Sequence, residues 1–178
     1  MKYAVIATNG RIIRVEDQVP SPPWSYVEIT NSQADEIAQN IEIQYIVDGE
    51  LYTVTEYSNK GAFDRNPTAY KLELRKIIAS QRYRQETSGM LYNGVRIKTD
   101  RVTQSILGNA RQMAKEDSNF TIDWKVNDTT FVTLTASQII QLANAMAQHV
   151  QAAFTKERTL NEAITAATTY SDIKTIEW

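Results

Sequence analysis

The chain has 178 residues, of which 42% are hydrophobic and 22% are charged. This is an ordinary globular composition, which argues against wholesale disorder and leaves room for one domain or two small ones. The sequence contains no cysteine and one histidine, His149, which excludes disulfides, thiol catalysis and metal sites built from thiolates or several histidines. No apolar run approaches the ~20 residues that span a bilayer, and the apolar stretch at the N-terminus is too short for a signal-peptide core.

Charge is unevenly distributed along the chain. Residues 1–60 contain four Lys/Arg and nine Asp/Glu, which gives −5, whereas residues 61–178 contain fifteen and twelve, which gives +3. The two values sum to the formal charge of −2 for the whole chain. This asymmetry indicates two units with different partners, but it is too weak to predict nucleic acid binding.

Residues 1–56 predict a β-rich module made of a small sheet and one helix. Two dipeptides, Asn9-Gly10 and Asp48-Gly49, stand between short apolar runs, and both favour the tight turn of a β-hairpin. A third strand at 26–29 and a helix at about 32–40, capped by Thr30 or Asn31, complete the module. Residues 57–67 concentrate Gly, Asn and Pro and lose periodicity, which predicts a linker.

Residues 68–178 predict a mainly helical domain with short hairpins, so the expected fold class is α+β. Helices are expected at about 68–87, from Thr99 or Asp100 to 117, at 136–166 behind a capping box that begins at Thr135, and in a last turn capped by Ser171. The intervening hairpins are expected to turn at Asn93-Gly94 and Asn127-Asp128.

Hydrophobic spacing predicts which side chains form the core of this domain. The helix after Asp100 has a stripe of apolar residues at helical spacing: Val102, Ile106, Leu107, Ala110, Met113 and Ala114. The strands and the last long helix add five further expected core residues: Trp124, Phe131, Leu142, Met146 and Val150.

No catalytic, cofactor-binding or metal-ligating residue is predicted. His149 lies in an apolar stripe with no local nucleophile or orienting partner, so it is interpreted as a packed or interface histidine. The carboxylate pairs Asp35/Glu36 and Glu116/Asp117 fall at expected helix ends and are interpreted as solvated charge.

Two further patterns resemble a calcium-binding loop and a nucleic-acid-binding helix, but neither predicts such a site. Asp48-Gly49-Glu50 lacks the alternating acids of a calcium loop. The basic run Lys71–Arg84, with Tyr70 and Tyr83, is more typical of a solvated or partner-facing helix than of a nucleic-acid module.

The segment from about residue 70 to 178 resembles a phage-associated domain of unknown function found at the C-termini of tail-fibre, baseplate and tail-fibre-assembly proteins. The resemblance rests on the order of a basic helix around Leu72–Ile77, the hairpin Leu91–Asp100, the strand around Trp124, and the Phe131–Ala136 strand that leads into the last long helix. The aromatic-Asn-Gly hairpin that closes on Thr-Asp is its most specific part.

The resemblance implies no catalytic residues. It implies a structural protein of a tailed-phage tail, at the baseplate or the tail-fibre attachment, made in the host cytoplasm and carried in the virion tail. The alternative is a tail-fibre assembly chaperone that is absent from the mature virion. The expected partners are other tail proteins and further copies of the chain, with threefold symmetry implied by the resemblance; no nucleic acid, membrane or cofactor is expected. An enzyme, such as a wall-degrading hydrolase, would need a catalytic constellation that the sequence does not show.

Overall fold

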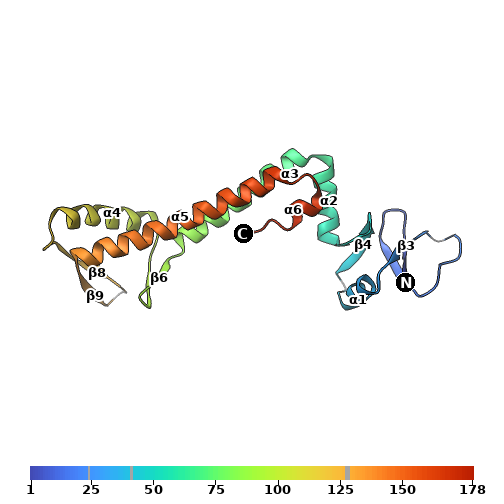
Figure 1. Cartoon of the computed structure of the whole chain (residues 1–178), viewed down its shortest axis with the longest axis horizontal. Coiled ribbons are helices and arrows are strands. Elements are labelled where there is room, and N and C mark those ends of the chain that lie inside the picture. The colour runs from blue at the N-terminus through green and yellow to red at the C-terminus, as the bar shows by residue number, and fades with distance from the viewer. Residues whose placement is uncertain (24, 41, 127–128) are drawn as a thin grey trace. The chain divides into compact units, whose positions relative to one another are not determined.

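The computed structural model describes residues 1–23, 25–40, 42–126 and 129–178. It confirms the α+β class, with antiparallel strands at the N-terminus and a mainly helical remainder (Figure 1). The chain divides into two compact units, Met1–Tyr70 and Lys71–Trp178. The expected turn at Asn127-Asp128 lies outside the described residues.

The first unit begins with a three-stranded antiparallel sheet. Its strands are β1 (Lys2–Ile6), β2 (Ile12–Glu16) and β3 (Ser25–Ile29), in the order β2-β1-β3. The predicted turn between the first two strands places Gly10 at φ 80°. A Cβ there would lie 2.7 Å from the carbonyl oxygen of Ile46, so the turn needs glycine for its backbone angle and for its close approach to the next hairpin.

The second hairpin and a short helix complete this sheet region. The hairpin consists of β4 (Ile43–Val47) and β5 (Glu50–Thr53), and α1 (Asn31–Gln39) is capped by Thr30 as predicted. The Ile46 N–H donates to the Gly10 carbonyl over 2.9 Å, which joins the hairpin to the first turn. The buried core shared by these elements is Ala4, Ile29, Ala34 and Ile46.

Residues 57–67, predicted as a linker without regular structure, are largely helical. Helix α2 spans Val54–Arg65, and α3 (Pro67–Thr87) begins after one intervening residue, Asn66. Thr53 and Glu56 form a capping box at the start of α2, and the Asn66 side chain accepts from the Ala69 N–H at the start of α3. End capping therefore supports these helices where the hydrophobic pattern is weak.

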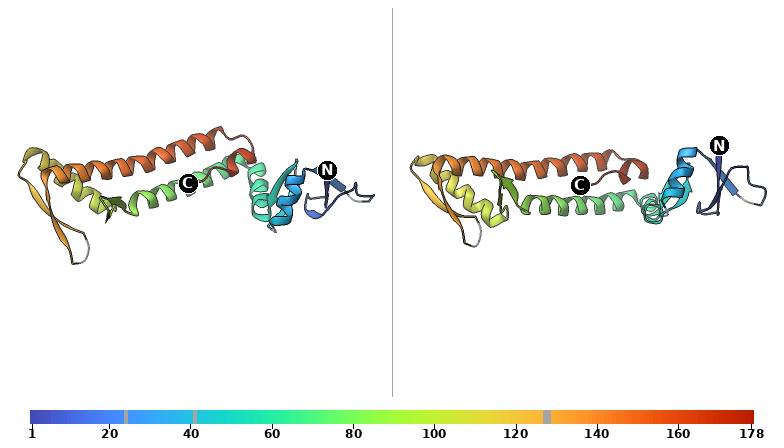
Figure 2. Two further views of the ribbon diagram at one scale, coloured as in Figure 1. Left: turned by 60° about the horizontal axis from the view of Figure 1, so that its bottom comes forward. Right: turned by 90° about the horizontal axis from the view of Figure 1, so that it is seen from below.

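The second unit is built along one long helix, α5 (Ala136–Ala166). Side-chain bonds from α3 to α5 join Arg75 to Thr165 and Arg82 to Glu157, so the two helices run antiparallel. Helix α4 (Arg101–Glu116) packs on the N-terminal half of α5. Figure 2 shows α3 and α4 following one another along α5.

Two hairpins stand at the ends of α4 and pack into the same core. They are formed by β6 (Met90–Tyr92) with β7 (Val95–Ile97), and by β8 (Thr121–Lys125) with β9 (Phe131–Thr135). The core joins both hairpins to α4 and α5, and its buried members are Met90, Ile97, Leu107, Ala110, Ala114, Ala136, Ile139, Leu142, Ala143 and Met146.

Most helix ends lie close to their predicted positions. Thr135 and Gln138 form the predicted capping box of α5, and Asp100 caps α4. The last helix, α6 (Tyr170–Lys174), is capped by Thr169, so the predicted cap at Ser171 is wrong.

The predicted core is confirmed only in part. Leu142 and Met146 are each 3% exposed, and Trp124 packs partly buried against the core. Phe131, however, is 62% exposed. It pairs with Lys125 on the outward face of its hairpin, because alternation along the strand turns it away from the face that carries Leu134.

The apolar stripe of α4 is likewise only half buried. Leu107, Ala110 and Ala114 face the core, but Val102, Ile106 and Met113 are 68%, 54% and 50% exposed. A helix packed between one long helix and two small hairpins cannot bury so wide a stripe, and the remainder stays on the surface.

Candidate functional site

The most buried charged group in the described residues is Glu86, in the last turn of α3, whose side chain is fully buried. Its carboxylate accepts from Arg82 one turn earlier, lies 3.0 Å from Arg101 Nη1 at the start of α4, and accepts from Gln104 Nε2 over 3.4 Å. We call these four residues the Glu86 cluster. An acid in the last turn of a helix opposes the helix dipole, so cationic partners are needed to hold it there.

Backbone bonds beside the Glu86 cluster fix the hairpin that follows α3. Buried Thr99 donates its hydroxyl to the Glu86 carbonyl over 2.6 Å and accepts from the Gly89 N–H over 2.9 Å. Gly89 has φ 94°, and a Cβ there would lie 2.9 Å from the Ile97 carbonyl oxygen. The cluster therefore ties α3, the β6–β7 hairpin and α4 together. Its buried carboxylate is satisfied by hydrogen bonds and ion pairs within the chain.

His149 lies beside the Glu86 cluster and makes a structural contact. Its Nε2 lies 3.0 Å from the Gln85 carbonyl oxygen, so this nitrogen donates and helps to hold α5 against the end of α3. The histidine is partly buried, in line with the interpretation of a packed residue. A catalytic base at this nitrogen would need a free lone pair, which the bond to a carbonyl does not leave.

The basic run of α3 serves mainly to join helices. Lys71 donates to the Ala167 carbonyl over 2.6 Å, and Arg75 donates to Thr165 Oγ1 over 2.8 Å. Arg82 donates to Glu157 Oε2 over 3.0 Å and lies 4.5 Å above the Phe154 ring. The interpretation of the run as a solvated or partner-facing surface is therefore wrong for these three side chains.

The predicted acidic pairs are exposed, and no metal site forms around them. Asp35, Glu36, Glu116 and Asp117 all lie on the surface. Within the four described stretches of the chain, no group of three or more His, Asp or Glu side chains is placed to hold a metal ion. The described helices also include none that is long and apolar enough to cross a membrane.

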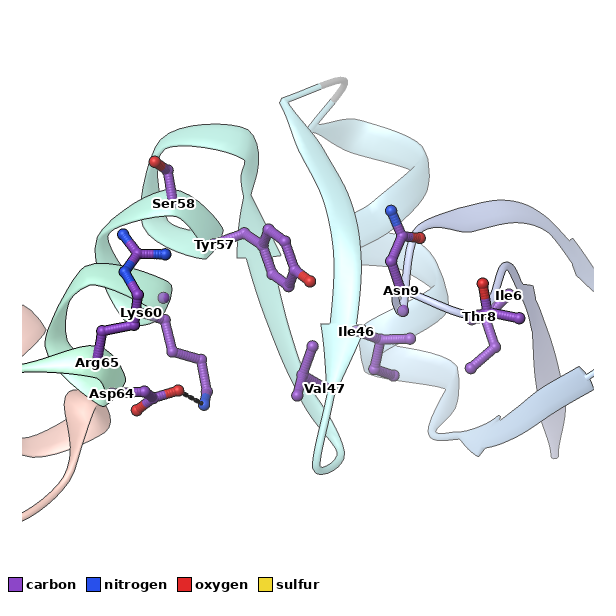
Figure 3. A pocket seen from close by; sticks show the side chains of 12 residues that line it. Ile6, Thr8, Asn9, Ile46, Val47, Tyr57, Ser58, Lys60, Asp64 and Arg65 are labelled. Atoms are coloured by element: carbon purple, nitrogen blue, oxygen red, sulfur yellow. Dashed lines mark hydrogen bonds and ion pairs between the residues drawn. The ribbon is translucent and has the colours of Figure 1, made fainter.

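A cavity of about 600 Å³ opens in the first unit between the Thr8–Gly10 turn, β4 and α2 (Figure 3). Tyr57 lines it and stacks on Tyr45 of β4, with ring centroids 4.0 Å apart. Lys60 donates to Asp64 over 2.7 Å, and this hydrogen bond raises the pKa of Lys60 above its ordinary value. The lysine therefore keeps its proton at neutral pH, which makes it unsuitable as a nucleophile or base.

The sequence patterns missed the Glu86 cluster and the packed role of the basic helix. One signal for the Glu86 cluster was the four-residue spacing of Arg82 and Glu86 near the end of a predicted helix. The other was Thr99, which lies three residues before Val102 in the turn between a predicted strand and the next helix. Spacing alone does not show that α4 brings Arg101 back to the end of α3, because that contact depends on the path of the β6–β7 hairpin.

The chain matches no curated protein and no solved structure. Residues 69–177, well over half of the chain, match the family described as Domain of unknown function (DUF4376). The matched segment covers nearly all of the second unit, including the α3–α5 pairing, the Glu86 cluster and both hairpins. The chain therefore belongs to the DUF4376 family.

Proposed function

We propose that this protein is a non-enzymatic structural component of a tailed-phage tail, located at the baseplate or the tail-fibre attachment, and that it acts through protein–protein interfaces. The proposal starts from the resemblance of about residues 70–178 to domains of phage tail proteins. It places the protein in the virion tail after synthesis in the host cytoplasm, with other tail proteins and further copies of the chain as its partners.

The observation that carries the proposal is the number of large apolar side chains that are exposed on the surface of the second unit. Val102, Ile106 and Met113 on α4 and Phe131 on β9 are each at least half exposed, and Leu91 on β6 is 73% exposed. Single exposed apolar residues are common, but several on neighbouring elements are typical of surfaces that other proteins cover.

The polar groups of the second unit support an interface role over a catalytic one. The one histidine and the buried acid are both engaged in contacts that join helices. A hydrolase would need a nucleophile, a base and an orienting group in mutual reach, and the Glu86 cluster instead pairs a carboxylate with two guanidinium groups.

The alternative function is a tail-fibre assembly chaperone. It would use the same exposed surfaces during assembly but would not remain in the finished particle. Mass spectrometry of purified particles from cells that carry the gene separates the two functions. Detection of the chain in intact particles at a fixed copy number supports the structural role. Its absence from particles that contain complete tail fibres would leave the chaperone.

A further inference from the structure

The surface of α5 lacks charge over twenty consecutive residues. From Ala136 to Thr155 the helix contains no Asp, Glu, Lys or Arg, although about a quarter of residues in soluble domains are charged, so about five are expected. By contrast, α3 carries seven charged residues in its 21 positions. A surface helix normally presents charge to water, so the uncharged stretch of α5 is unusual.

The exposed positions in this stretch follow a helical seam. Six uncharged polar residues recur at alternating steps of four and three, and all are exposed. We call them the α5 seam, and they are Ser137, Gln141, Asn144, Gln148, Gln151 and Thr155. This spacing keeps the six side chains in a line along one face of the helix. It is the spacing of the contact line between packed helices, although the residues of such a line are usually apolar. The small residues Ala147 and Ala152 flank the seam and are also exposed, which permits close approach of a second helix.

A groove beside the seam contains a buried polar atom without a partner. The groove, of about 330 Å³, runs between α4 and α5 and shares Ala147 and Gln151 with the seam and its flank. Arg111 of α4 lines it, and the Nε atom of Arg111 is buried with no hydrogen-bond acceptor among the described residues. Because this atom is already enclosed by the chain itself, a second molecule does not reach it, and the groove contributes only its surface to the contact proposed below.

We propose that a second copy of this chain packs antiparallel along the α5 seam, about a twofold axis near the middle of the stretch. This inference rests on the proposed interface function and names its partner. Antiparallel pairing about Met146 places Ser137 opposite Thr155, Gln141 opposite Gln151, and Asn144 opposite Gln148. Each amide then meets another amide, which can both donate and accept.

The charges next to the seam favour the antiparallel direction. The step pattern continues past Thr155 to Arg158 and Glu162. In a parallel pair each of these residues would face its own copy, and like charges would meet. The antiparallel pair overlaps only the uncharged stretch, and a twofold arrangement of this kind is the commonest symmetry of soluble oligomers. The pairing is therefore twofold rather than the threefold symmetry that the resemblance implies.

The size of the surface fits a specific but modest interface. The seam spans 18 residue steps, or roughly 27 Å at 1.5 Å per residue, and the seam with the groove is roughly 18 Å wide. The footprint of about 490 Å² per partner lies below the roughly 600 Å² per partner of the smallest stable interfaces and in the range of weak, transient ones. We therefore expect the pair to form at micromolar concentration.

Sedimentation equilibrium of the full chain at 1–100 µM (on the order of the expected Kd) tests the pairing. The wild type should approach twice the chain mass of 20.2 kDa. Gln148→Glu should shift the mass to that of the monomer, with at least a ~10-fold weaker Kd. The carboxylates at position 148 of the two copies then lie about one helical turn apart (roughly 6 Å along the axis) on either side of the twofold axis, within a Debye length of each other. Adding Asn144→Lys to that variant should restore the pair, because each lysine then lies opposite a glutamate of the other copy.

The matched control is Ile77→Glu, an exposed apolar position on α3, which should leave the mass unchanged. Circular dichroism should show the same helix content in every variant. The proposal is overturned if the wild type is a monomer throughout, if Gln148→Glu leaves the pair intact, or if Ile77→Glu dissociates it instead. It is also overturned if Asn144→Lys fails to restore pairing. None of these outcomes bears on whether the chain is present in purified particles, which tests the proposed function separately.

Discussion

Arg101 Nη1 lies 3.0 Å from Glu86 Oε1, which joins the first turn of α4 to the last turn of α3 across the β6–β7 hairpin. Arg101 is 58% exposed while Glu86 is fully buried, so the arginine shields the buried carboxylate at the protein surface. The contact brings together residues fifteen positions apart and sets the direction in which α4 leaves the hairpin.

Removal of this carboxylate should destabilise the second unit. We expect Glu86→Ala to lower the free energy of unfolding by about 3 kcal/mol, the lower end of the cost of breaking a buried ion pair, because Arg82 keeps Glu157 and Arg101 can turn to solvent. The matched control is Glu73→Ala, which removes an exposed pair with Lys76 and should cost less than about 0.5 kcal/mol. Urea denaturation measures both, and equal effects would contradict the structural role of the cluster.

The core between α4 and α5 should be sensitive to loss of volume. Leu142→Ala should cost about 2–5 kcal/mol, because the residue is almost fully buried and leaves a cavity. Phe131→Ala, which removes a larger but exposed side chain, should change the stability by no more than about 0.5 kcal/mol. Thermal or urea unfolding of the two variants measures these changes in stability. A larger loss of stability for Phe131→Ala than for Leu142→Ala would contradict the placement of Phe131 on the exposed face of β9.

The start of α6 should respond to acid. Backbone N–H groups of Thr168 and Thr169 donate to Asp172 over 2.9 and 2.8 Å, and these bonds lower the pKa of Asp172 to about 2. A carboxyl with a lowered folded pKa stabilises the fold above its unfolded pKa, near 4, and this stabilisation is lost as the pH falls towards 2.

Asp172→Asn tests this pH dependence. The variant should melt below the wild type at pH 7, and the difference in Tm should shrink between pH 4 and pH 2. A difference that stays constant across this range would show that the charge of Asp172 does not contribute.

The two compact units should separate under limited proteolysis. Trypsin should cut first after Arg65, next to Asn66, the single residue between α2 and α3, because a helix end opens more readily than a packed helix interior. A stable fragment that begins at residue 66 should accumulate. Early cleavage at Lys156 or Arg158, inside α5, would contradict this prediction.

Turn chemistry and capping allowed the fold class and most element ends to be predicted from the sequence. Asn9-Gly10, Asp48-Gly49 and Asn93-Gly94 each hold a hairpin turn, and positive φ values at Asp48, Asn93 and the three glycines explain why. These signals act over four or five residues, so they do not depend on the path of the rest of the chain.

The misses arise where long-range packing decides the outcome. Residues 57–65 form a helix without a clear apolar stripe, held by a capping box and by the stacking of Tyr57 on Tyr45. The apolar stripe of α4 predicts burial for Val102 and Met113, but both side chains are exposed in the part of the chain that the structure describes. The basic residues of α3 look like a free surface in the sequence, because their acceptors lie more than 70 positions away.

The candidate interface was only partly visible in the sequence. An alanine-rich last long helix is evident from the sequence, but the α5 seam requires knowledge of which positions α3 and α4 cover. Only then do Gln141, Asn144 and Gln148 emerge as an exposed line, with Arg111 beside it.

The most direct test of the interface-based structural role is photo-crosslinking inside purified phage particles. A photo-reactive phenylalanine derivative is placed at Ala147, beside the α5 seam, and in a matched variant at Ile77 on α3. Our account predicts that the chain is present in the particles and that position 147 crosslinks to a second copy or to another tail protein, whereas position 77 gives little product. A chain that is absent from intact particles, or that crosslinks equally from both positions, would contradict it.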